Sequence, residues 1–439
     1  MLMKKTILST IFLATLIFSN IAFPQQMEVK TLNLRQCIKI ALKNNPQILA
    51  SQIGVAKLKK KIPEARAGFY PSLNLNADAS RLSAQPGFNA GKIGDSYNTG
   101  LSMRYNIFQG GKTIASVHAA RHNYQAGKSE FKANEQDLIL SVTEAYYQLL
   151  QAEQFTRVAE KSLQRAQSHL DFANARFKTG LASRSDILKA KTERSNAKLD
   201  LIHARNAVLM AHGQLNVALG RNVSSPIKII DDLSKAAANA TQGNQNKFQA
   251  LVREAFKKRP ELRKINDQLQ AQRSFIRLAK ADYLPTVSLD ANYNFSGAEV
   301  SQLYQSNYIG LSVRLPLFSG FSRPARVSQE KLQLRVLEQQ AASLRQQISL
   351  EVWNAFLALK EVKERIVNTQ VFLKDAKENL NISEGEYKEG VGSMLDVLDA
   401  ETTFVAAQQH YIEALADYKI AQMGLQRAVN GKYFEEILK

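Results

Sequence analysis

The segment GLSMRYNIFQG at residues 100–110 reappears as GLSVRLPLFSG at residues 310–320, which lies 210 positions further on. The same offset relates RFKTGLASRSDILKA at 176–190 to EYKEGVGSMLDVLDA at 386–400. Two aligned copies of this length indicate that one ancestral unit was duplicated, so each motif has to be interpreted as one of a pair. A third stretch aligns residues 36–79 without a gap on residues 250–293, at an offset of 214.

The duplication predicts two structural repeats, residues 27–230 and 248–439, each with helices, two strands and a long helical hairpin. Between them, residues 231–247 are rich in small and amide side chains, which favours a linker or an exposed strap. The chain begins with two lysines and a short apolar run, which is typical of a secretory signal peptide over residues 1–22. A membrane anchor is the weaker alternative, because the run is shorter than the ~20 residues that span a bilayer.

Each half contains two segments in which apolar and polar residues alternate strictly. This pattern predicts four strands with one apolar and one polar face, as in a transmembrane β-barrel wall, which needs ~9–11 tilted residues per crossing. A strand of an ordinary sandwich would show the same alternation. The Gly-, Ser- and Asn-rich segments around 85–96 and 297–306 are predicted to be exposed hairpin loops. The apolar positions are Leu73, Leu75, Ala77 and Ala79; Leu101, Met103, Tyr105 and Ile107; Val287, Leu289, Ala291, Tyr293 and Phe295; and Leu311, Val313, Leu315 and Leu317.

The remaining sequence is typical of unusually long helices. From Lys112 to about Thr179 there is no proline, and at ~1.5 Å per residue a single helix here would be about 100 Å long. Apolar residues recur at alternating spacings of three and four from Leu138 to Phe177, and again 210 positions later. After a short turn a second helix returns with the same spacing. A seam of this period predicts one antiparallel coiled-coil hairpin in each half.

Composition argues against several other classes of protein. The net charge is +19, but the lysines and arginines are dispersed along helical faces, so no nucleic acid partner is expected. The single cysteine, Cys37, is predicted to be a small buried side chain. His118 and His122 have helical spacing for a metal, but neither a third ligand nor a general base accompanies them. We therefore predict no enzyme activity, no metal and no cofactor.

Four membrane strands cannot close a barrel, and open sheet edges are not stable in lipid, so further copies of the chain must complete it. Two copies would give a barrel filled by side chains, whereas three give twelve strands and leave a lumen. Residues 108–111 and 318–320 lead each strand into a long helix, so the helices should extend the barrel wall. The sequence thus favours a homotrimeric channel. A trimeric, envelope-spanning coiled-coil protein that does not conduct is the alternative.

The strand exits at Phe108 and Phe318, the turns TGLAS at 179–183 and EGVGS at 389–393, and LDVLDA at 395–400 resemble the TolC family of outer-membrane efflux and secretion channels. The resemblance implies a mainly α fold with a membrane β-barrel portion, in which three protomers form a twelve-stranded barrel and a periplasmic α-barrel tunnel. It also implies a periplasmic adaptor (membrane fusion) protein, an inner-membrane RND or ABC transporter and outer-membrane lipid as partners.

The two helical turns are expected at the end of the molecule farthest from the strands. In each turn a glycine ends the first helix and a serine caps the second, with a carboxylate (Asp186 or Asp396) three residues later. The resemblance implies a second role, because the matching turns in the family contact the adaptor. The residues concerned are Gly180, Leu181, Ser183, Gly390, Val391 and Ser393.

Asp396 and Asp399 are three residues apart and so share one face of a helix. Their first-half counterparts are Asp186 and Lys189, so only the second half keeps both carboxylates. A carboxylate that no cap requires, in an otherwise apolar helix, indicates a polar lumen. With threefold symmetry the two aspartates would form acidic rings at the closed pore entrance and favour cations. The resemblance implies that these rings constrict the entrance, because family members carry aspartate rings there.

One position departs from the family pattern. Gly392 stands where some relatives have a basic residue that locks neighbouring hairpins together. Tyr387 and Asp186 match other members of that lock. We therefore expect the closed state to be held differently, with Arg184 in place of the missing basic residue.

Overall fold

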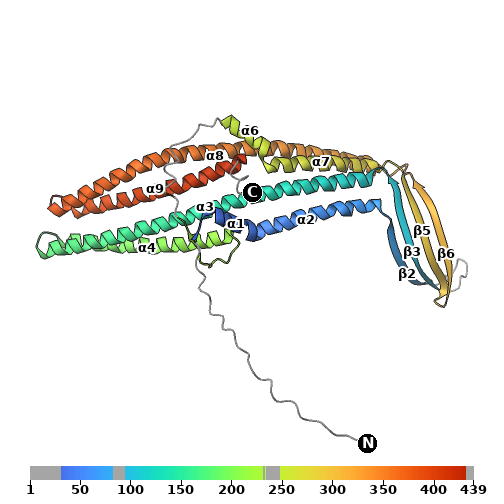
Figure 1. Cartoon of the computed structure of the whole chain (residues 1–439), viewed down its shortest axis with the longest axis horizontal. Coiled ribbons are helices and arrows are strands. Elements are labelled where there is room, and N and C mark those ends of the chain that lie inside the picture. The colour runs from blue at the N-terminus through green and yellow to red at the C-terminus, as the bar shows by residue number, and fades with distance from the viewer. Residues whose placement is uncertain (1–30, 83–93, 231–232, 234–247, 432–439) are drawn as a thin grey trace, which may run out of the picture.

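The computed structural model describes residues 31–82, 94–230, 233 and 248–431, which form an elongated molecule (Figure 1). A β-sheet lies at one end, and paired helices run from it to two turns at the other end. The predicted signal peptide and the predicted linker, apart from Leu233, fall outside the described residues. The two turns therefore lie at the end of the molecule farthest from the sheet, as the sequence predicts.

The sheet has four strands in the order β2-β3-β5-β6, and every neighbouring pair is antiparallel. The central pairing, β3 with β5, joins the two halves of the chain and places Leu101 opposite Tyr293. The outer strands β2 and β6 each have a partner on one side only among the described residues. The strands are β2 (Ser72–Leu82), β3 (Gly94–Gln109), β5 (Thr286–Glu299) and β6 (Gln302–Arg314).

One face of this sheet is apolar and exposed, as the alternation predicts. Leu75, Ile309 and Val313 are 73%, 78% and 65% exposed. The other face is polar, and there the Arg104 guanidinium pairs with the Asp290 carboxylate at 2.7 Å across β3 and β5. An outward apolar face over an inward polar face is the arrangement of a barrel wall that meets lipid outside and water inside.

Three strand boundaries differ from the sequence prediction. Strand β3 begins at Gly94, within the segment around 85–96 predicted to be a loop, and residues 85–93 of that segment lie outside the described residues. Strand β6 ends before Leu315, so Leu315 and Leu317 lie beyond it, because Pro316 has no N–H to donate to a ladder. The segment around 297–306, predicted to be an exposed loop, is mostly strand. Only residues 300–301 separate β5 from β6, because the tight turn lets both strands continue pairing almost to their ends.

The long helices match the predicted hairpins. The first, α3, has 67 residues and its second-half counterpart, α8, has 68. A shorter helix packs back along each one, α4 along α3 and α9 along α8. Within the described chain, no helix is both long and apolar enough to cross a membrane. The four helices are α3 (Lys112–Lys178), α4 (Arg184–Ala218), α8 (Ser322–Glu389) and α9 (Met394–Val429).

The predicted seam forms the core of the hairpins. Val142 and Leu149 in the first half, and Ile348 and Val352 in the second, are fully buried. Phe177 is the exception, because it is 45% exposed although the seam predicts a buried side chain there. Its duplicate Tyr387, at the same place in α8, is 8% exposed.

The junctions between strands and helices require left-handed backbone. Gly110 and Gly111 have φ angles of 61° and 83° before α3 begins. Their second-half counterparts are Gly320, with φ 57°, and Phe321, with φ 63°. Glycine adopts this conformation at no steric cost, whereas a bulky residue such as phenylalanine is strained in it. The sharp change of direction is therefore local, and the duplicated sequences achieve it with different residues.

Shorter elements lie beside the long helices between their middle and the sheet. Asn45 caps α2, accepting from the Gln47 amide at 2.9 Å, and its side chain donates to the Ala218 carbonyl at 3.0 Å. Cys37 is buried as predicted, and burial raises the pKa of its thiol to about 11. The elements are β1 (Thr31–Leu32), α1 (Leu34–Asn44), α2 (Pro46–Arg66), η1 (Ala67–Phe69), β4 (Lys228–Ile229), α6 (Phe248–Lys258) and α7 (Pro260–Ala281), and β1 pairs with β4.

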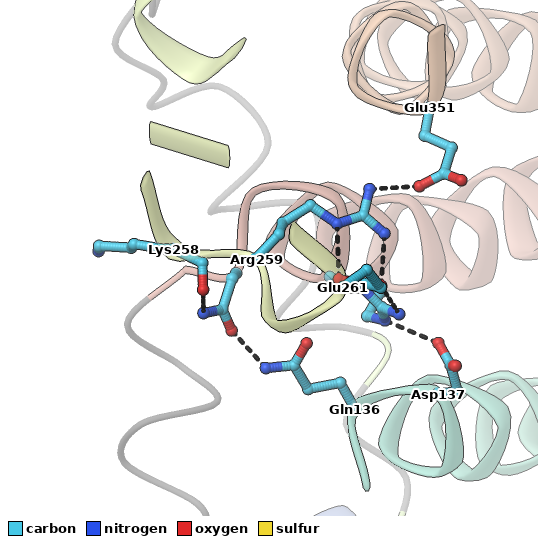
Figure 2. A network of polar contacts seen from close by, with 8 residues as sticks. Gln136, Asp137, Lys258, Arg259, Glu261 and Glu351 are labelled. Atoms are coloured by element: carbon cyan, nitrogen blue, oxygen red, sulfur yellow. Dashed lines mark hydrogen bonds and ion pairs between the residues drawn. The ribbon is translucent and has the colours of Figure 1, made fainter. Parts of the chain in front are cut away.

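A network of ion pairs between α3, α7, α8 and α9 connects the two halves of the chain (Figure 2). Arg427 of α9 contacts Asp137 of α3 at 2.7 Å and Glu261 of α7 at 2.6 Å. Arg259 pairs with Glu261 at 2.8 Å and also with Glu351 of α8. Burial alone would raise the pKa of Glu261, but the two arginines outweigh it and lower the pKa to about 2. Glu261 is thus held as a carboxylate.

Candidate functional site

The turn of the first hairpin is built from a glycine, a serine and a carboxylate. Gly180 follows α3 with φ 77°, a conformation that ends a helix readily in glycine. Ser183 caps α4, because its hydroxyl accepts from the Asp186 amide at 3.2 Å. The Asp186 carboxylate accepts in return from the Ser183 amide at 3.0 Å. The predicted capping box is therefore present.

The second hairpin repeats this design. Gly390 ends α8 with φ 85°, and Ser393 caps α9. The Asp396 carboxylate accepts from the Ser393 hydroxyl at 2.7 Å and from the Ser393 amide at 3.0 Å. These hydrogen bonds, led by that from the hydroxyl, lower the pKa of Asp396 below its usual range. Asp396 consequently keeps its negative charge in mildly acidic solution.

Asp399 lies on the same exposed side of α9 as Asp396. The neighbouring Val397 and Ala400 are buried in the hairpin, which turns the two aspartates away from the core. Neither aspartate forms an ion pair with another described residue, so both charges are free to act on solvent or ions. The geometry matches the paired carboxylates that the sequence analysis places on one helical face.

The two hairpins touch each other just above their turns, through Arg176 of α3 and Tyr387 of α8. The Arg176 guanidinium donates to the backbone carbonyls of Tyr387 and, at 3.2 Å, of Lys388. It also lies over the Tyr387 ring, 5.2 Å from the ring centre. The Phe172 ring packs edge-on against Tyr387 at 5.7 Å. Arg176 and Phe172 of the first half therefore pack against Tyr387 of the second half and hold the two hairpins together near their turns.

Tyr387 is 8% exposed and lies near Asp186. Burial raises the pKa of its hydroxyl, and the negative charge of Asp186 raises it further. The structure thus brings together two of the three residues assigned to the lock. The third, Arg184, is exposed at the start of α4. Within the single chain, Arg176 is the cation that reaches Tyr387.

Sequence reasoning missed Arg176. One signal was available, because the duplicate of Arg176 is Glu386, a residue of opposite charge. Gly392 could not simply regain a side chain, since a Cβ atom there would approach the Glu386 Cβ to 2.9 Å. Its amide donates instead to the Glu386 carbonyl at 3.0 Å.

Further along the hairpins, a buried ion pair makes a second contact between the halves. Glu401 of α9 is 3% exposed and accepts from the Arg165 guanidinium of α3 at 2.8 and 2.9 Å. The Ser162 hydroxyl donates to the same carboxylate at 3.2 Å. The guanidinium also lies 5.3 Å from the centre of the Phe404 ring. This set of residues fixes the register of α3 against α9.

The remaining tip residues are accessible. Leu181 is 69% exposed and Val391 is 81% exposed, each directly after the glycine that ends its helix. An exposed apolar side chain on a rigid, capped turn offers a contact for another protein.

The described residues include no group of three or more His, Cys, Asp and Glu that could hold a metal ion. His122 contacts Asp267 of α7 at 3.3 Å. This contact joins α3 to α7.

Known proteins share this fold and sequence pattern. The sequence is 23% identical over 420 residues to the outer membrane protein TolC of Vibrio cholerae, covering 90% of each chain. It is 25% identical to the protein CyaE of Bordetella pertussis, covering 92% of this chain and 85% of that one. The structure superposes on the Campylobacter jejuni CmeC outer membrane channel with a TM-score of 0.78 and 18% identity, covering 92% of this chain and 89% of that chain. The family model described as outer membrane efflux protein matches residues 37–221 and 251–431. The chain therefore belongs to the outer membrane efflux protein family, and its place is the outer membrane.

Proposed function

We propose that three copies of this chain form a channel that passively conducts substrates from the periplasm to the exterior. The observation that carries this proposal is the sheet, whose apolar face is exposed and whose outer strands lack a second partner among the described residues. A sheet of this kind is stable in lipid only when it closes into a barrel. Three copies supply twelve strands, enough to leave a lumen.

Aromatic residues support a membrane boundary at the junction of sheet and helices. Phe69 and Tyr70 lie just before β2, and Phe318 and Phe321 just before α8. All four are exposed, with Tyr70 at 68% and Phe321 at 75%. Transmembrane barrels carry such aromatic girdles where the hydrocarbon ends and the headgroups begin. Outer-membrane lipid is thus the partner of the sheet, and the helices extend into the periplasm.

The hairpin turns form the pore entrance in this proposal. Asp396 and Asp399 constrict it, and three copies of each would form two acidic rings that favour cations. Asp186, Tyr387 and Arg184 would gate it, a role supported by the proximity of Asp186 to Tyr387 beside the turns. Opening requires the hairpins to separate at this end while the barrel stays closed to lipid.

The exposed turns also offer the docking site for a periplasmic adaptor protein. Gly180, Leu181 and Ser183 would contribute from one hairpin, and Gly390, Val391 and Ser393 from the other. The adaptor would connect the channel to an inner-membrane transporter of the RND or ABC class. Among the relatives, one is described as a probable efflux pump outer membrane protein of Pseudomonas putida. Efflux of small molecules and type I secretion of proteins are both compatible with such a duct.

Reconstitution of the purified protein in planar bilayers tests the proposal. We expect trimers with discrete, cation-selective conductance steps that the Asp396→Asn and Asp399→Asn variants make less selective. Stable trimers without any conductance, including in variants altered at the turns, would favour the non-conducting coiled-coil alternative.

A further inference from the structure

The duplication relates contacts inside the chain to contacts between chains. Adding 210 to a residue of α3 gives its counterpart in α8, and subtracting 210 from a residue of α9 gives its counterpart in α4. Subtracting 214 from a residue of α7 gives its counterpart in α2. Within the chain, α3 packs against α7 and α9 of the other half. The equivalent contact for α8 is with α2 and α4, and in a ring these belong to a second copy.

The surfaces that this contact would cover are exposed in the single chain. On α8, Leu332 and Ile382 are 54% and 53% exposed. On the opposite surface, Ile53 of α2 and Phe177 near the tip are 69% and 45% exposed. The outer strands β2 and β6 lie on the same two sides of the molecule and likewise lack a partner among the described residues. The only occupant that supplies both missing surfaces at the right spacing is another copy of this chain.

The most informative counterpart is that of the buried Arg165–Glu401 pair. Arg165 corresponds to Asp375 in α8, and Glu401 corresponds to Lys191 in α4. Both positions carry the opposite charge from their counterparts, so the pair stays complementary although each sign is reversed. Asp375 and Lys191 are exposed, and neither forms an ion pair with another described residue. We propose that Asp375 of one copy pairs with Lys191 of the next across each subunit boundary.

The residues beside the pair follow the same relation. Ser162 and Phe404, which flank the pair inside the chain, correspond to Phe372 and Arg194. Phe372 is 39% exposed and precedes Asp375 by three residues, and Arg194 follows Lys191 by three, so each couple shares a helical face. The boundary therefore also has an arginine and an aromatic ring beside the ion pair. Here the ring is on the α8 side and the arginine on the α4 side, the reverse of the arrangement inside the chain.

Two further contacts between the halves map onto apolar couples. The His122–Asp267 contact at 3.3 Å corresponds to Leu332 and Ile53, both apolar and exposed. The Phe172–Tyr387 ring contact corresponds to Ile382 and Phe177.

This second couple accounts for the exposed Phe177, whose seam position predicts burial. A neighbouring copy supplies the side chain that covers it. Polar and aromatic contacts inside the chain are thereby replaced by hydrophobic ones at the boundary.

The reversed charges of the two ion pairs also determine the order in which first and second halves follow one another around the trimer. If α3 of one copy met α4 of another, Arg165 would face Lys191. If α8 met α9, Asp375 would face Glu401. Both arrangements put like charges together at a contact that excludes water, which is strongly unfavourable. Only the alternating order, α3 on α9 within a chain and α8 on α4 between chains, pairs opposite charges at every boundary.

The inference rests on the proposed trimer. A cross-linking experiment distinguishes failure of the pairing from failure of the trimer. Copies with Lys191→Cys and copies with Asp375→Cys, both in a Cys37→Ala background, are produced together and treated with a short bismaleimide. We expect a covalent dimer from the mixture and none from either variant alone. As a control, Arg165→Cys with Glu401→Cys in one chain should cross-link without forming dimers. Conducting trimers that yield no dimer from the mixture would overturn the pairing while leaving the channel proposal intact, whereas a lone subunit would overturn both.

Charge reversal provides a second measurement that does not depend on cysteine chemistry. Lys191→Glu and Asp375→Lys should each lower the trimer fraction in detergent at least about tenfold, because like charges then meet at three boundaries. The double variant, Lys191→Glu with Asp375→Lys, should restore trimers. Lys377→Glu, two residues along α8 and thus on another face, serves as the control and should leave trimers unchanged. Full trimer formation by both single variants, or failure of the double variant to restore it, would contradict the pairing.

Discussion

The Arg176 guanidinium donates a hydrogen bond to the backbone carbonyl of Lys388 at 3.2 Å, so the end of one hairpin holds the end of the other. The same guanidinium lies over the Tyr387 ring, one residue earlier. A cation that bonds backbone carbonyls and covers an aromatic ring contributes more than an exposed ion pair. In the proposed channel the hairpins separate at this level when the entrance widens, so we expect the contact to stabilise the closed state.

The first prediction concerns that contact. Arg176→Ala should raise single-channel conductance or open probability in planar bilayers, because loss of a charge-assisted hydrogen bond of about 1.5–3 kcal/mol shifts the open-to-closed ratio by about tenfold or more. Arg205→Ala is the matched control, since Arg205 makes an exposed ion pair with Glu160 on the same hairpin, away from the turn. Unchanged gating in Arg176→Ala would show that the contact does not hold the entrance closed.

A separate prediction concerns Arg184, which is exposed in the single chain. If it replaces the basic residue that Gly392 lacks, its partner lies on a neighbouring copy. Arg184→Ala should then also raise conductance in planar bilayers. Conductance equal to that of the unaltered protein would leave Arg176 as the cation that locks the entrance.

The proposed acidic rings predict how cation selectivity depends on pH. The Ser393 hydroxyl and amide lower the pKa of Asp396, so its charge should persist as pH falls through the ordinary carboxyl range. Cation selectivity, measured as reversal potential in a salt gradient, should therefore decline only in strongly acidic solution. Ser393→Ala removes the hydroxyl that contributes most, and the decline should then begin at a higher pH. If cation selectivity declined over the same pH range in both proteins, Asp396 would not determine the selectivity.

The network around Glu261 predicts how stability depends on pH. Its pKa falls from an ordinary value of 4.5 to about 2 in the folded protein, which corresponds to about 3 kcal/mol of stabilisation. This contribution is fully present above about pH 4.5 and is lost as pH decreases toward 2. Glu261→Gln should therefore lower the thermal midpoint at neutral pH by an amount that shrinks through this window. Glu378 is an exposed carboxylate on α8, so Glu378→Gln should have little effect on the thermal midpoint, both at neutral pH and in acid.

The strand-to-helix junctions offer a matched pair of glycines. Gly110 and Gly320 are duplicates with φ angles of 61° and 57°. A Cβ atom at Gly110 would come within 2.7 Å of the Ala281 carbonyl oxygen, whereas one at Gly320 would meet nothing within 4 Å. Both alanine variants carry a left-handed cost of about 1–2 kcal/mol, but only Gly110→Ala also displaces a neighbour. Gly110→Ala should therefore show the lower thermal midpoint in detergent, and equal midpoints would contradict this.

The sequence alone determined the elements that depend on neighbouring residues. Alternation of apolar and polar residues determined four strands, a seam of period 3.5 determined helices of 67 and 68 residues, and Gly180 with Ser183 determined a capped turn. Each of these signals acts over a few residues, so it can be recognised without knowing the fold. The boundaries of the two repeats, 27–230 and 248–439, stay predictions.

Only the tertiary structure decided which residues of the two halves meet. Arg176 reaches Lys388 across 212 positions of sequence, and Arg427 joins Asp137 across 290, and no local pattern indicates either partner. The same holds for Phe177, whose periodicity predicts burial but whose side chain is 45% exposed in the single chain. Such contacts depend on how rigid helices pack over their whole length, and small differences in angle and register select among many chemically acceptable partners. The duplication narrows that choice, because a contact seen once inside the chain indicates where its counterpart forms between chains.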